Sequence, residues 1–419
     1  MTNEDNKDRF SEIKGHFGEK KKFSEQLDIL KGLELFDNLD SSSKGVCLYG
    51  EKEHGKKFIA KTFAAKLDRE CLIYSWGQEL ETNSQNLDIR NKVDDISSRG
   101  IKKITLLLLQ ADMASEEILR LIYDSYTSIT DVYVIATIDD VDTAGAEYCR
   151  LITSVKVPVN EPTLEEKREM LGYLMYEKYR WMKFTPSIDE MLDLFVMEDY
   201  RGMDLFIMQS VAKAAICQED ITLEEIVEIM YRAKPCIDEN REYIIRAGVH
   251  EAGHALMMLL LNNKIKGSII INNEDGTTFN DRETLSQSSD RKNVILIWLA
   301  GRAAEEIYYG NFDRGHIYDL NSVSKYILQG IAEGGYYGLE YLRIENSPAQ
   351  IDKIDRKAHE VIINSYREAM ERLNPYKELL GRIGKLVAER RYATFTEIKG
   401  FLEEFSIMGE VSEDYTAVS

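Results

Sequence analysis

The stretch from Gly45 to about Asn160 alternates short apolar segments with segments of helical pattern, and this alternation limits the fold more than any other feature. Strands that are separated by helices favour a parallel sheet with helices on its faces. The expected strands are Val46–Tyr49, Cys71–Ser75, Ile104–Leu109 and Val132–Thr137. This region is therefore expected to fold as an α/β domain.

The remainder of the chain is predicted to be mainly helical. Thr163, followed by Glu166, predicts a capping box that opens a helical region, and Pro235 indicates where that region ends. The last region contains one predicted strand, Gly267–Asn272. Because 419 residues exceed one ordinary core, we expect several domains. The predicted boundaries are an N-terminal segment 1–40, an α/β domain 41–160, a helical subdomain 161–236 and a final domain 237–419.

Charge and cysteine usage exclude several classes of protein. The formal net charge of −20 disfavours binding to nucleic acid or to an anionic membrane. Five scattered cysteines without a CxxC spacing are typical of a reducing compartment, so the cytoplasm is expected. The first ten residues are polar and mixed in charge, so a signal peptide is not expected there. No uninterrupted apolar run reaches the roughly 20 residues that span a bilayer, so no membrane insertion is expected.

The segment His250-Glu251-Ala252-Gly253-His254 has the spacing of a metal site on a helix. Positions i and i+4 share one helix face, so His250 and His254 can bind one ion. Glu251 lies beside that face and can accept a proton from a water molecule at the metal. This pattern predicts a zinc site with Glu251 as the catalytic base.

A catalytic zinc site of this kind needs a third protein ligand. Spacing alone does not choose among the downstream candidates. These are Glu305, Glu306, Asp313, His316 and Asp319.

Three segments resemble signatures of the FtsH family of ATP-dependent zinc metalloproteases. They are Val249-His250-Glu251-Ala252-Gly253-His254-Ala255-Leu256, Leu299-Ala300-Gly301-Arg302-Ala303-Ala304-Glu305-Glu306-Ile307 and Gly315-His316-Ile317-Tyr318-Asp319-Leu320. The resemblance extends from about Gly45 to about Gly400 and is strongest in 246–320. It implies an AAA-like α/β domain with a helical lid, followed by a mainly α-helical zinc metallopeptidase domain.

The resemblance also implies individual roles. The third zinc ligand is expected to be Asp319, with His316, which replaces a small residue of the family, kept as a rival or supporting ligand. Glu305 and Glu306 are expected to support the ligands rather than to bind the metal. The stretch 264–279 resembles the family strand beside the active site, which could hold a substrate as an added strand.

The phosphate-loop position departs from the family pattern. Gly50, Gly55 and Lys56 are retained, but Lys57 stands where a working loop has a magnesium-binding Ser or Thr. Glu51 and Glu53 add negative charge where a triphosphate would bind, and like charges about 4 Å apart repel by about 4 kcal/mol at an effective dielectric of ~20. No bound nucleotide is therefore expected.

The other ATPase residues are altered as well. Leu109-Gln110 stands where the strand should end in Asp-Glu, and Asp139 replaces the expected asparagine. Arg150 lacks the flanking residues of an arginine finger, and Ser84-Gln85-Asn86 provides no pore aromatic. Because the chain resembles the family but lacks these ATPase residues, we expect a soluble relative that does not hydrolyse ATP.

These expectations combine into one function. The chain is expected to be a zinc metalloendopeptidase that cleaves unfolded or flexible polypeptides without ATP hydrolysis, and the family resemblance suggests a homo-oligomer, with a hexamer as the leading form. The alternative is a scaffold or regulatory subunit with an inactive ATPase domain, which presents clients to an FtsH-like protease or joins its ring. Retention of His250, Glu251, His254 and Asp319 together disfavours that alternative.

Overall fold

The computed structural model describes ten segments of the chain. They are residues 10–34, 45–52, 54–76, 82–232, 241–262, 264–272, 275–280, 291–313, 317–334 and 348–416. The chain divides into two compact units, each of which is described by itself. The first contains Met1–Tyr173 and Glu198–Asp204, and the second contains Leu174–Met197 and Leu205–Ser419.

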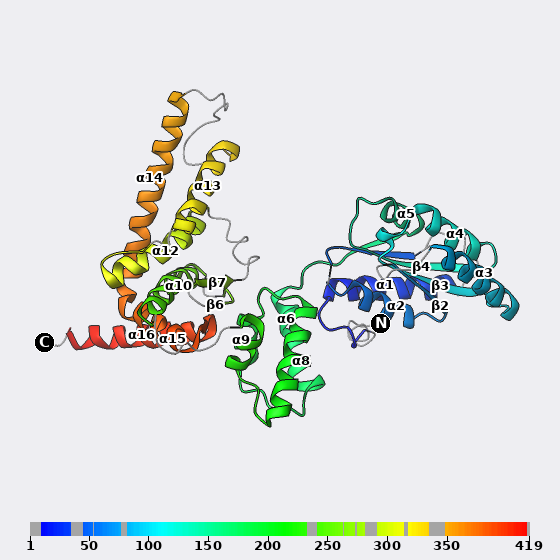
Figure 1. Ribbon diagram of the computed structural model, residues 1–419, viewed down its shortest axis with the longest axis horizontal. Coiled ribbons are helices and arrows are strands. Elements are labelled where there is room, and N and C mark those ends of the chain that lie inside the picture. The colour runs from blue at the N-terminus through cyan, green and yellow to red at the C-terminus, as the bar shows by residue number, and fades with distance from the viewer. Residues whose placement is uncertain are drawn as a thin grey trace. The chain divides into compact units, whose positions relative to one another are not determined.

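The first unit is built on a parallel sheet of five strands with the order β2-β3-β4-β1-β5 (Figure 1). The strands are β1 (Gly45–Tyr49), β2 (Glu70–Ser75), β3 (Lys103–Leu109), β4 (Asp131–Ile138) and β5 (Val155–Pro158). The parallel sheet and the four expected strands are confirmed. The edge strand β5 was not predicted, because four residues are too few to show a pattern.

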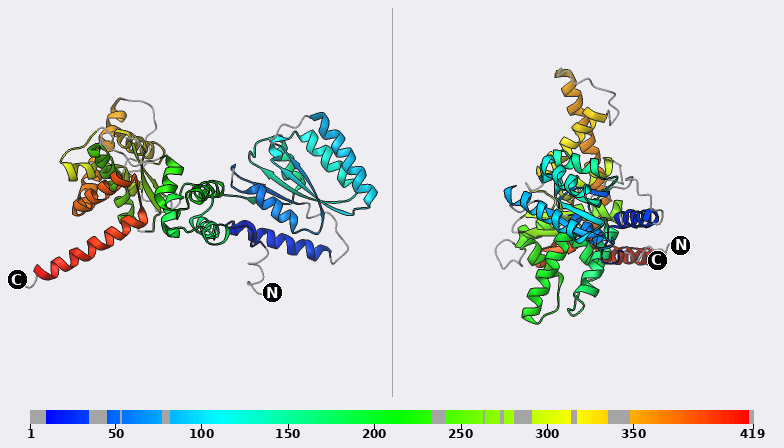
Figure 2. Two further views of the ribbon diagram at one scale, coloured as in Figure 1. Left: turned by 60° about the horizontal axis from the view of Figure 1, so that its bottom comes forward. Right: turned by 90° about the vertical axis from the view of Figure 1, so that its right-hand side faces the viewer.

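Helices cover both faces of this sheet (Figure 2). Leu106 and Leu108 pack on one face, and Leu107 and Leu109 on the other, because successive side chains of a strand point to opposite sides. The first face is covered by α3 (Thr82–Arg99), α4 (Glu116–Thr127) and α5 (Ala144–Ile152), and the second by α1 (Phe17–Glu34) and α2 (Lys56–Ala65). Each fully buried leucine contributes about 1.5–3 kcal/mol, so β3 is a main source of stability.

A capping box opens the helical region, as predicted. The Glu166 amide donates to Thr163 Oγ1 at 3.3 Å, and the Thr163 amide donates to Glu166 Oε2 at 3.0 Å. Both hydrogen bonds satisfy groups that a helix start leaves free. The elements that follow are α6 (Leu164–Tyr173), a π-helical turn η2 (Leu174–Lys178), α7 (Ile188–Leu194), α8 (Tyr200–Cys217) and α9 (Leu223–Tyr231).

The second unit is organised around the buried helix α10 (Arg241–Leu261). This helix shares one apolar core with α12 (Arg291–Tyr309) and α15 (Lys377–Arg390). A second apolar cluster joins α12 to α13 (Ile317–Gly334) and α14 (Pro348–Leu373), which lie side by side (Figure 1). The remaining elements are the short helices η1 (Ala111–Met113, first unit) and η4 (Asn374–Tyr376), and α16 (Phe395–Thr416).

The second unit also contains an antiparallel sheet with the order β7-β6-β8. The predicted strand is confirmed as β6 (Gly267–Asn272), but one strand was expected here and the structure has three. The other two are β7 (Asp275–Asn280) and β8 (Tyr392–Thr394). Neither could be recognised from its pattern, because β7 is polar and β8 has only three residues.

Helix α10 is unusually apolar for its length. Within the described residues it is the one helix that is long and apolar enough to cross a membrane by length and composition alone. The count of uninterrupted apolar runs did not identify it. However, 72% of its most apolar window is buried inside the protein, and the core helix of a soluble protein has the same property.

Candidate metal centre

Helix α10 presents two histidines, one turn apart, to helix α12. His250 and His254 are both buried, and their Nε2 atoms lie 3.1 Å apart. The space for these rings is provided by Gly301 of α12: a Cβ at this position would lie 2.4 Å from His250 Nε2 and 2.5 Å from His254 Nε2. A larger residue at 301 would therefore fill the place where the two nitrogens converge.

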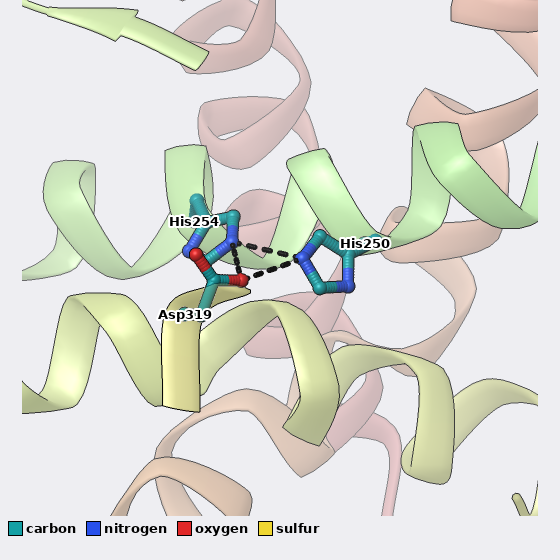
Figure 3. Close-up of side chains that lie close together, drawn as sticks. All are labelled: His250, His254 and Asp319. Carbon is teal, nitrogen blue, oxygen red and sulfur yellow. Dashed lines mark hydrogen bonds and ion pairs between the residues drawn. The ribbon is translucent and has the colours of Figure 1, made fainter. Parts of the chain in front are cut away.

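Asp319, in the first turn of α13, completes the cluster (Figure 3). Its Oδ2 atom lies 3.0 Å from His250 Nε2 and 3.3 Å from His254 Nε2. Each of the three residues thus offers one ligand atom to the same point. Tetrahedral zinc with bonds of about 2.0–2.1 Å separates neighbouring ligand atoms by roughly 3.3 Å, which is close to these distances.

The other ring nitrogens are held by acceptors. His254 Nδ1 lies 2.7 Å from the carbonyl oxygen of Ile297, and His250 Nδ1 lies 2.8 Å from Glu305 Oε1. A carbonyl oxygen only accepts, so His254 donates from Nδ1 and its Nε2 is a lone-pair donor to a metal. Two lone pairs and a carboxylate oxygen that converge in this way require a cation between them, and the residues fit zinc.

Electrostatics show the same need for positive charge. Burial opposes a charge on His250, but its hydrogen bonds with Asp319 and Glu305 outweigh burial and raise the pKa of the imidazole to about 10. Burial also opposes the charge on Asp319, yet its close contacts with the two histidines hold its pKa well below the usual range. Without metal a proton therefore supplies the cation, and a metal ion must displace that proton.

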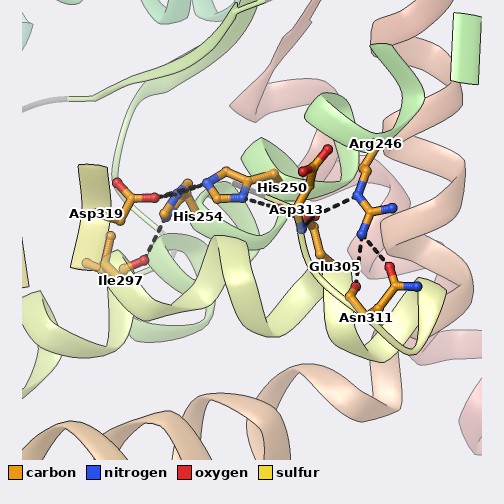
Figure 4. A network of polar contacts seen from close by, with 8 residues as sticks. All are labelled: Arg246, His250, His254, Ile297, Glu305, Asn311, Asp313 and Asp319. Atoms are coloured by element: carbon orange, nitrogen blue, oxygen red, sulfur yellow. Dashed lines mark hydrogen bonds and ion pairs between the residues drawn. The ribbon is translucent and has the colours of Figure 1, made fainter. Parts of the chain in front are cut away.

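Glu305 connects His250 to a second layer of polar contacts (Figure 4). Its Oε2 atom accepts from Arg246 Nε at 2.8 Å and from the Asp313 amide at 2.9 Å. Arg246 also donates to the backbone oxygen of Asn311 at 3.1 Å. Despite burial, these donors and His250 lower the pKa of Glu305, so this carboxylate stays ionised and orients the ring of His250.

The remaining candidates for the third ligand lie in other environments. Glu306 accepts from the Tyr366 hydroxyl at 2.6 Å. Asp313 contributes its backbone amide to Glu305, and His316 lies outside the described residues. Among the described candidates, Asp319 is the one whose carboxylate meets both Nε2 atoms.

Glu251 follows His250 on α10 and lies at the edge of a cavity of about 480 Å³. The cavity has an apolar wall and a polar side, and the polar side includes Glu251 and two residues of the histidine cluster (His250, His254 and Asp319), namely His254 and Asp319. Its lining includes Glu251, His254, Asp319, Met258, Ile297 and Trp298, together with Gly276 and Thr278 of β7. No sequence motif distinguishes Thr278, Trp298 or Arg246, so these three residues were not predicted.

The phosphate-loop position of the first unit has a different chemistry. Gly55, with φ of 86°, precedes helix α2, and Lys56 is 4% exposed. The Lys56 ammonium donates to the Gly50 carbonyl at 2.8 Å and to that of Glu51, and it pairs with Asp139 at 2.8 Å. The positive charge of Lys56 is therefore already balanced, and its hydrogen bonds are already made, by groups of the protein.

Neighbouring side chains complete this arrangement. The Lys57 ammonium donates to Gln110 Oε1 at 2.6 Å, and Arg150 donates to the Val141 carbonyl at 2.7 Å. Glu51 is exposed, whereas Glu53 lies outside the described residues. The segment 84–86 falls within helix α3.

Comparison with known proteins gives a consistent set of relatives. No family model matches the chain. The ATP-dependent zinc metalloprotease FtsH of Streptobacillus moniliformis is 22% identical over 95% of the chain and 65% of its own length. FtsH 2 of Thermoanaerobacter sp. is 24% identical over 90% of the chain and 79% of its own length. FtsH of Aquifex aeolicus is 23% identical over 96% of the chain and 70% of its own length.

These alignments include both units, but leave part of each relative without a counterpart in this chain. The parallel sheet of the first unit and the mainly helical second unit are consistent with an ATPase-type domain joined to a protease domain. The chain is a distant relative of the FtsH family.

Proposed function

We propose that this protein is a zinc metalloendopeptidase that hydrolyses peptide bonds of unfolded or flexible polypeptides without ATP hydrolysis. The observation that carries the proposal is the convergence of His250, His254 and Asp319 on one point, with Glu251 beside them at a cavity. The relationship to FtsH proteases supports the same reaction class.

The three converging residues would hold the metal through His250 Nε2, His254 Nε2 and the Asp319 carboxylate. Bound zinc supplies a Lewis acid that polarises the peptide carbonyl and makes water a better nucleophile at neutral pH. Glu305 and the Ile297 carbonyl keep the Nδ1 atoms occupied, so both rings stay oriented toward the metal.

Glu251 would act as the general base. Its Oε2 atom accepts a hydrogen bond from Thr278, whereas Oε1 has no hydrogen-bond partner among the described residues. Oε1 is therefore the atom that takes the proton of the attacking water, and the same carboxyl later returns it to the leaving amine. The apolar side chains of Met258, Ile297 and Trp298 would hold a substrate side chain and exclude water.

Polypeptides in an extended form are the proposed substrates. Within the described residues β7 lies at the edge of its sheet, and its residues Gly276 and Thr278 line the cavity beside Glu251. An extended segment could pair with this edge as an additional strand and bring a peptide bond to the metal. Folded proteins do not offer such segments.

The absence of ATP hydrolysis is proposed on the chemistry of the first unit. Lys56, the residue that would contact phosphates, is paired with Asp139 and two backbone carbonyls. Lys57 replaces the hydroxyl residue that would bind magnesium, and Gln110 stands where an acidic residue is needed. We therefore propose that the first unit is an ATPase-like domain without nucleotide chemistry.

The layout and setting of the protein belong to the same proposal. The proposed boundaries are an N-terminal segment 1–40, an AAA-like domain 41–160, a lid 161–236 and a peptidase domain 237–419. We propose a cytoplasmic homo-oligomer, with a hexamer suggested by the family resemblance alone. The net charge of −20 supports a protein that does not bind nucleic acid. The burial of α10 inside the protein supports the proposal that the protein does not insert into membranes.

A cleavage assay tests the proposal. Zinc-loaded protein is incubated without nucleotide with a labelled, intrinsically unfolded polypeptide, and the Glu251→Gln variant with confirmed zinc serves as the control. Cleavage by the wild type alone supports the proposal. If neither protein cleaves while zinc is bound, the chain is better explained as a scaffold or regulatory subunit of an FtsH-like protease.

A further inference from the structure

Strand β7 contacts the side chain of Glu251 directly. The Thr278 hydroxyl lies 2.7 Å from Glu251 Oε2 and 3.3 Å from the Glu251 carbonyl oxygen. Thr278 is half-buried, and it pairs with the fully buried Ile269 of β6, which belongs to the core around α10. The hydroxyl is therefore held in place by the sheet and the core rather than by a free loop.

A second residue of β7 limits where Glu251 can lie. A Cβ at Gly276 would stand 2.6 Å from Glu251 Cγ and 3.1 Å from Glu251 Oε1. Real Cβ atoms essentially never approach so closely, so any side chain at 276 would push the stem of Glu251 aside. Gly276 provides the space that the glutamate occupies, and Thr278 provides the hydrogen bond that fixes its end.

These contacts answer a requirement of the chemistry. A glutamate has three side-chain torsions, and a general base works only when its oxygen is within reach of the proton that it takes. A hydroxyl that donates to the ionised carboxylate forms a charge-assisted hydrogen bond, which fixes the orientation of both oxygens. With Oε2 held by Thr278, the other oxygen is the one presented to the substrate.

We propose that Gly276 and Thr278 are positioning residues for Glu251, so that strand β7 sets the location of the catalytic base. This inference rests on the proposed peptidase function. It predicts that the strand contributes to the rate of the chemical step and not only to substrate binding. A merely structural link between β7 and α10 would instead affect stability and KM.

The main test compares Thr278→Val, which keeps the shape but removes the hydroxyl, with Thr278→Ser, which restores it. Thr278→Val is expected to lower kcat roughly tenfold with KM changed less than about twofold, and Thr278→Ser to recover most of the rate. Ser268→Ala is the matched control. It removes a hydroxyl from the neighbouring strand β6, where Ser268 pairs with Phe279 and has no hydrogen-bond partner among the described residues.

A second variant acts by a different route. Gly276→Ala adds a methyl group against the flexible stem of Glu251 and is expected to lower kcat at least as much as Thr278→Val, with zinc content unchanged. Wild-type kcat in both Thr278→Val and Gly276→Ala would overturn the proposal.

A measurement without turnover separates this inference from the proposed function. The carboxylate ¹³C resonance of Glu251, identified by its loss in Glu251→Gln, is expected to shift in Thr278→Val and to return in Thr278→Ser. An unchanged resonance in Thr278→Val overturns the positioning role, whether or not the wild type cleaves polypeptide. A wild type that binds zinc and cleaves nothing overturns the peptidase function, and the resonance then decides the positioning of Glu251 alone.

Discussion

The phosphate-loop position of the first unit and the histidine cluster of the second both bury charged side chains, but they balance the charge differently. In the first unit the Lys56 ammonium is paired with Asp139 and with backbone carbonyls. In the second unit the Nε2 atoms of His250 and His254 and the carboxylate of Asp319 converge on one point, where a proton on His250 supplies the positive charge when no metal is bound. One region is complete without a ligand, whereas the other needs a cation.

This difference indicates which chemistry a distant relative keeps. A buried charge without a partner destabilises a protein by several kcal/mol, so a site that loses its ligand must acquire an internal partner or lose the charge. Lys56 has such a partner in Asp139. In the histidine cluster the Asp319 carboxylate is balanced only by a proton on His250, which is itself a proposed ligand, and the convergence of three ligand atoms on one point favours a metal there.

The largest expected effect comes from removing the third metal ligand. We expect wild-type protein to bind one zinc per chain, and Asp319→Ala or His254→Ala to lose zinc and peptidase activity together, because two ligands cannot complete a catalytic site. Elemental analysis of purified protein measures the zinc. Full zinc occupancy in Asp319→Ala would contradict the assignment and move the third ligand to His316 or Glu305.

The internal ion pair of the first unit can be broken by Asp139→Asn. Leaving the Lys56 ammonium buried without its carboxylate is expected to destabilise the first unit by about 3 kcal/mol. Denaturant unfolding measures this change. The exposed neighbour supplies a control, since Asp140→Asn should have little effect.

A double variant sharpens that result. Lys56→Met combined with Asp139→Asn removes both charges, so it should be less destabilised than Asp139→Asn alone. Additive losses in the double variant would show that the two side chains do not depend on each other. In that case the charges of Lys56 and Asp139 would not compensate each other.

A smaller effect is expected from a change at Glu305, which contacts the metal ligand His250 but does not bind the metal itself. Glu305→Gln removes the charge that accepts from His250 and Arg246, and zinc affinity should fall about 10- to 100-fold with the fold retained. Competition with a zinc-binding dye gives the affinity. Glu306→Gln is the matched control, because Glu306 contacts Tyr366 instead. Equal affinities in the two variants would remove Glu305 from the metal centre.

The smallest expected effect is the response to nucleotide. Zinc at 100 times its dissociation constant stabilises the state that binds it by about 2.7 kcal/mol, whereas millimolar Mg-ATP should leave thermal unfolding unchanged because Lys56 is already paired. A calorimetric scan compares the two additions. A clear rise in the unfolding temperature with Mg-ATP would show that the first unit binds nucleotide, and would contradict the difference between the two regions.

Sequence patterns predicted the parallel sheet, the capping box at Thr163 and strand β6, because each has a local signal. His250 and His254 could be paired from helix periodicity. Asp319 is 65 residues further along the chain, where spacing left five candidates, so only the family resemblance selected it. Local sequence signals are therefore sufficient to predict helices and strands, and to predict which residues of one helix lie on the same face.

Other features depend on tertiary contacts that no local pattern encodes. The hydrogen bond from Thr278 to Glu251 requires the register of β7 against β6, and β7 itself has no apolar alternation. The altered residues of the phosphate loop led to the prediction that no nucleotide binds, but the pairing of Lys56 with Asp139 joins the start of helix α2 to the residue that follows strand β4. Such contacts can be identified only once the chain is folded.

The most direct measurement of the contrast between the two regions is the cleavage rate of a labelled, unfolded polypeptide by zinc-loaded protein, with and without Mg-ATP. We predict the same rate in both conditions and no cleavage by zinc-loaded Glu251→Gln. Cleavage that requires Mg-ATP would contradict the account, because the first unit would then have nucleotide chemistry that its internal ion pair should prevent.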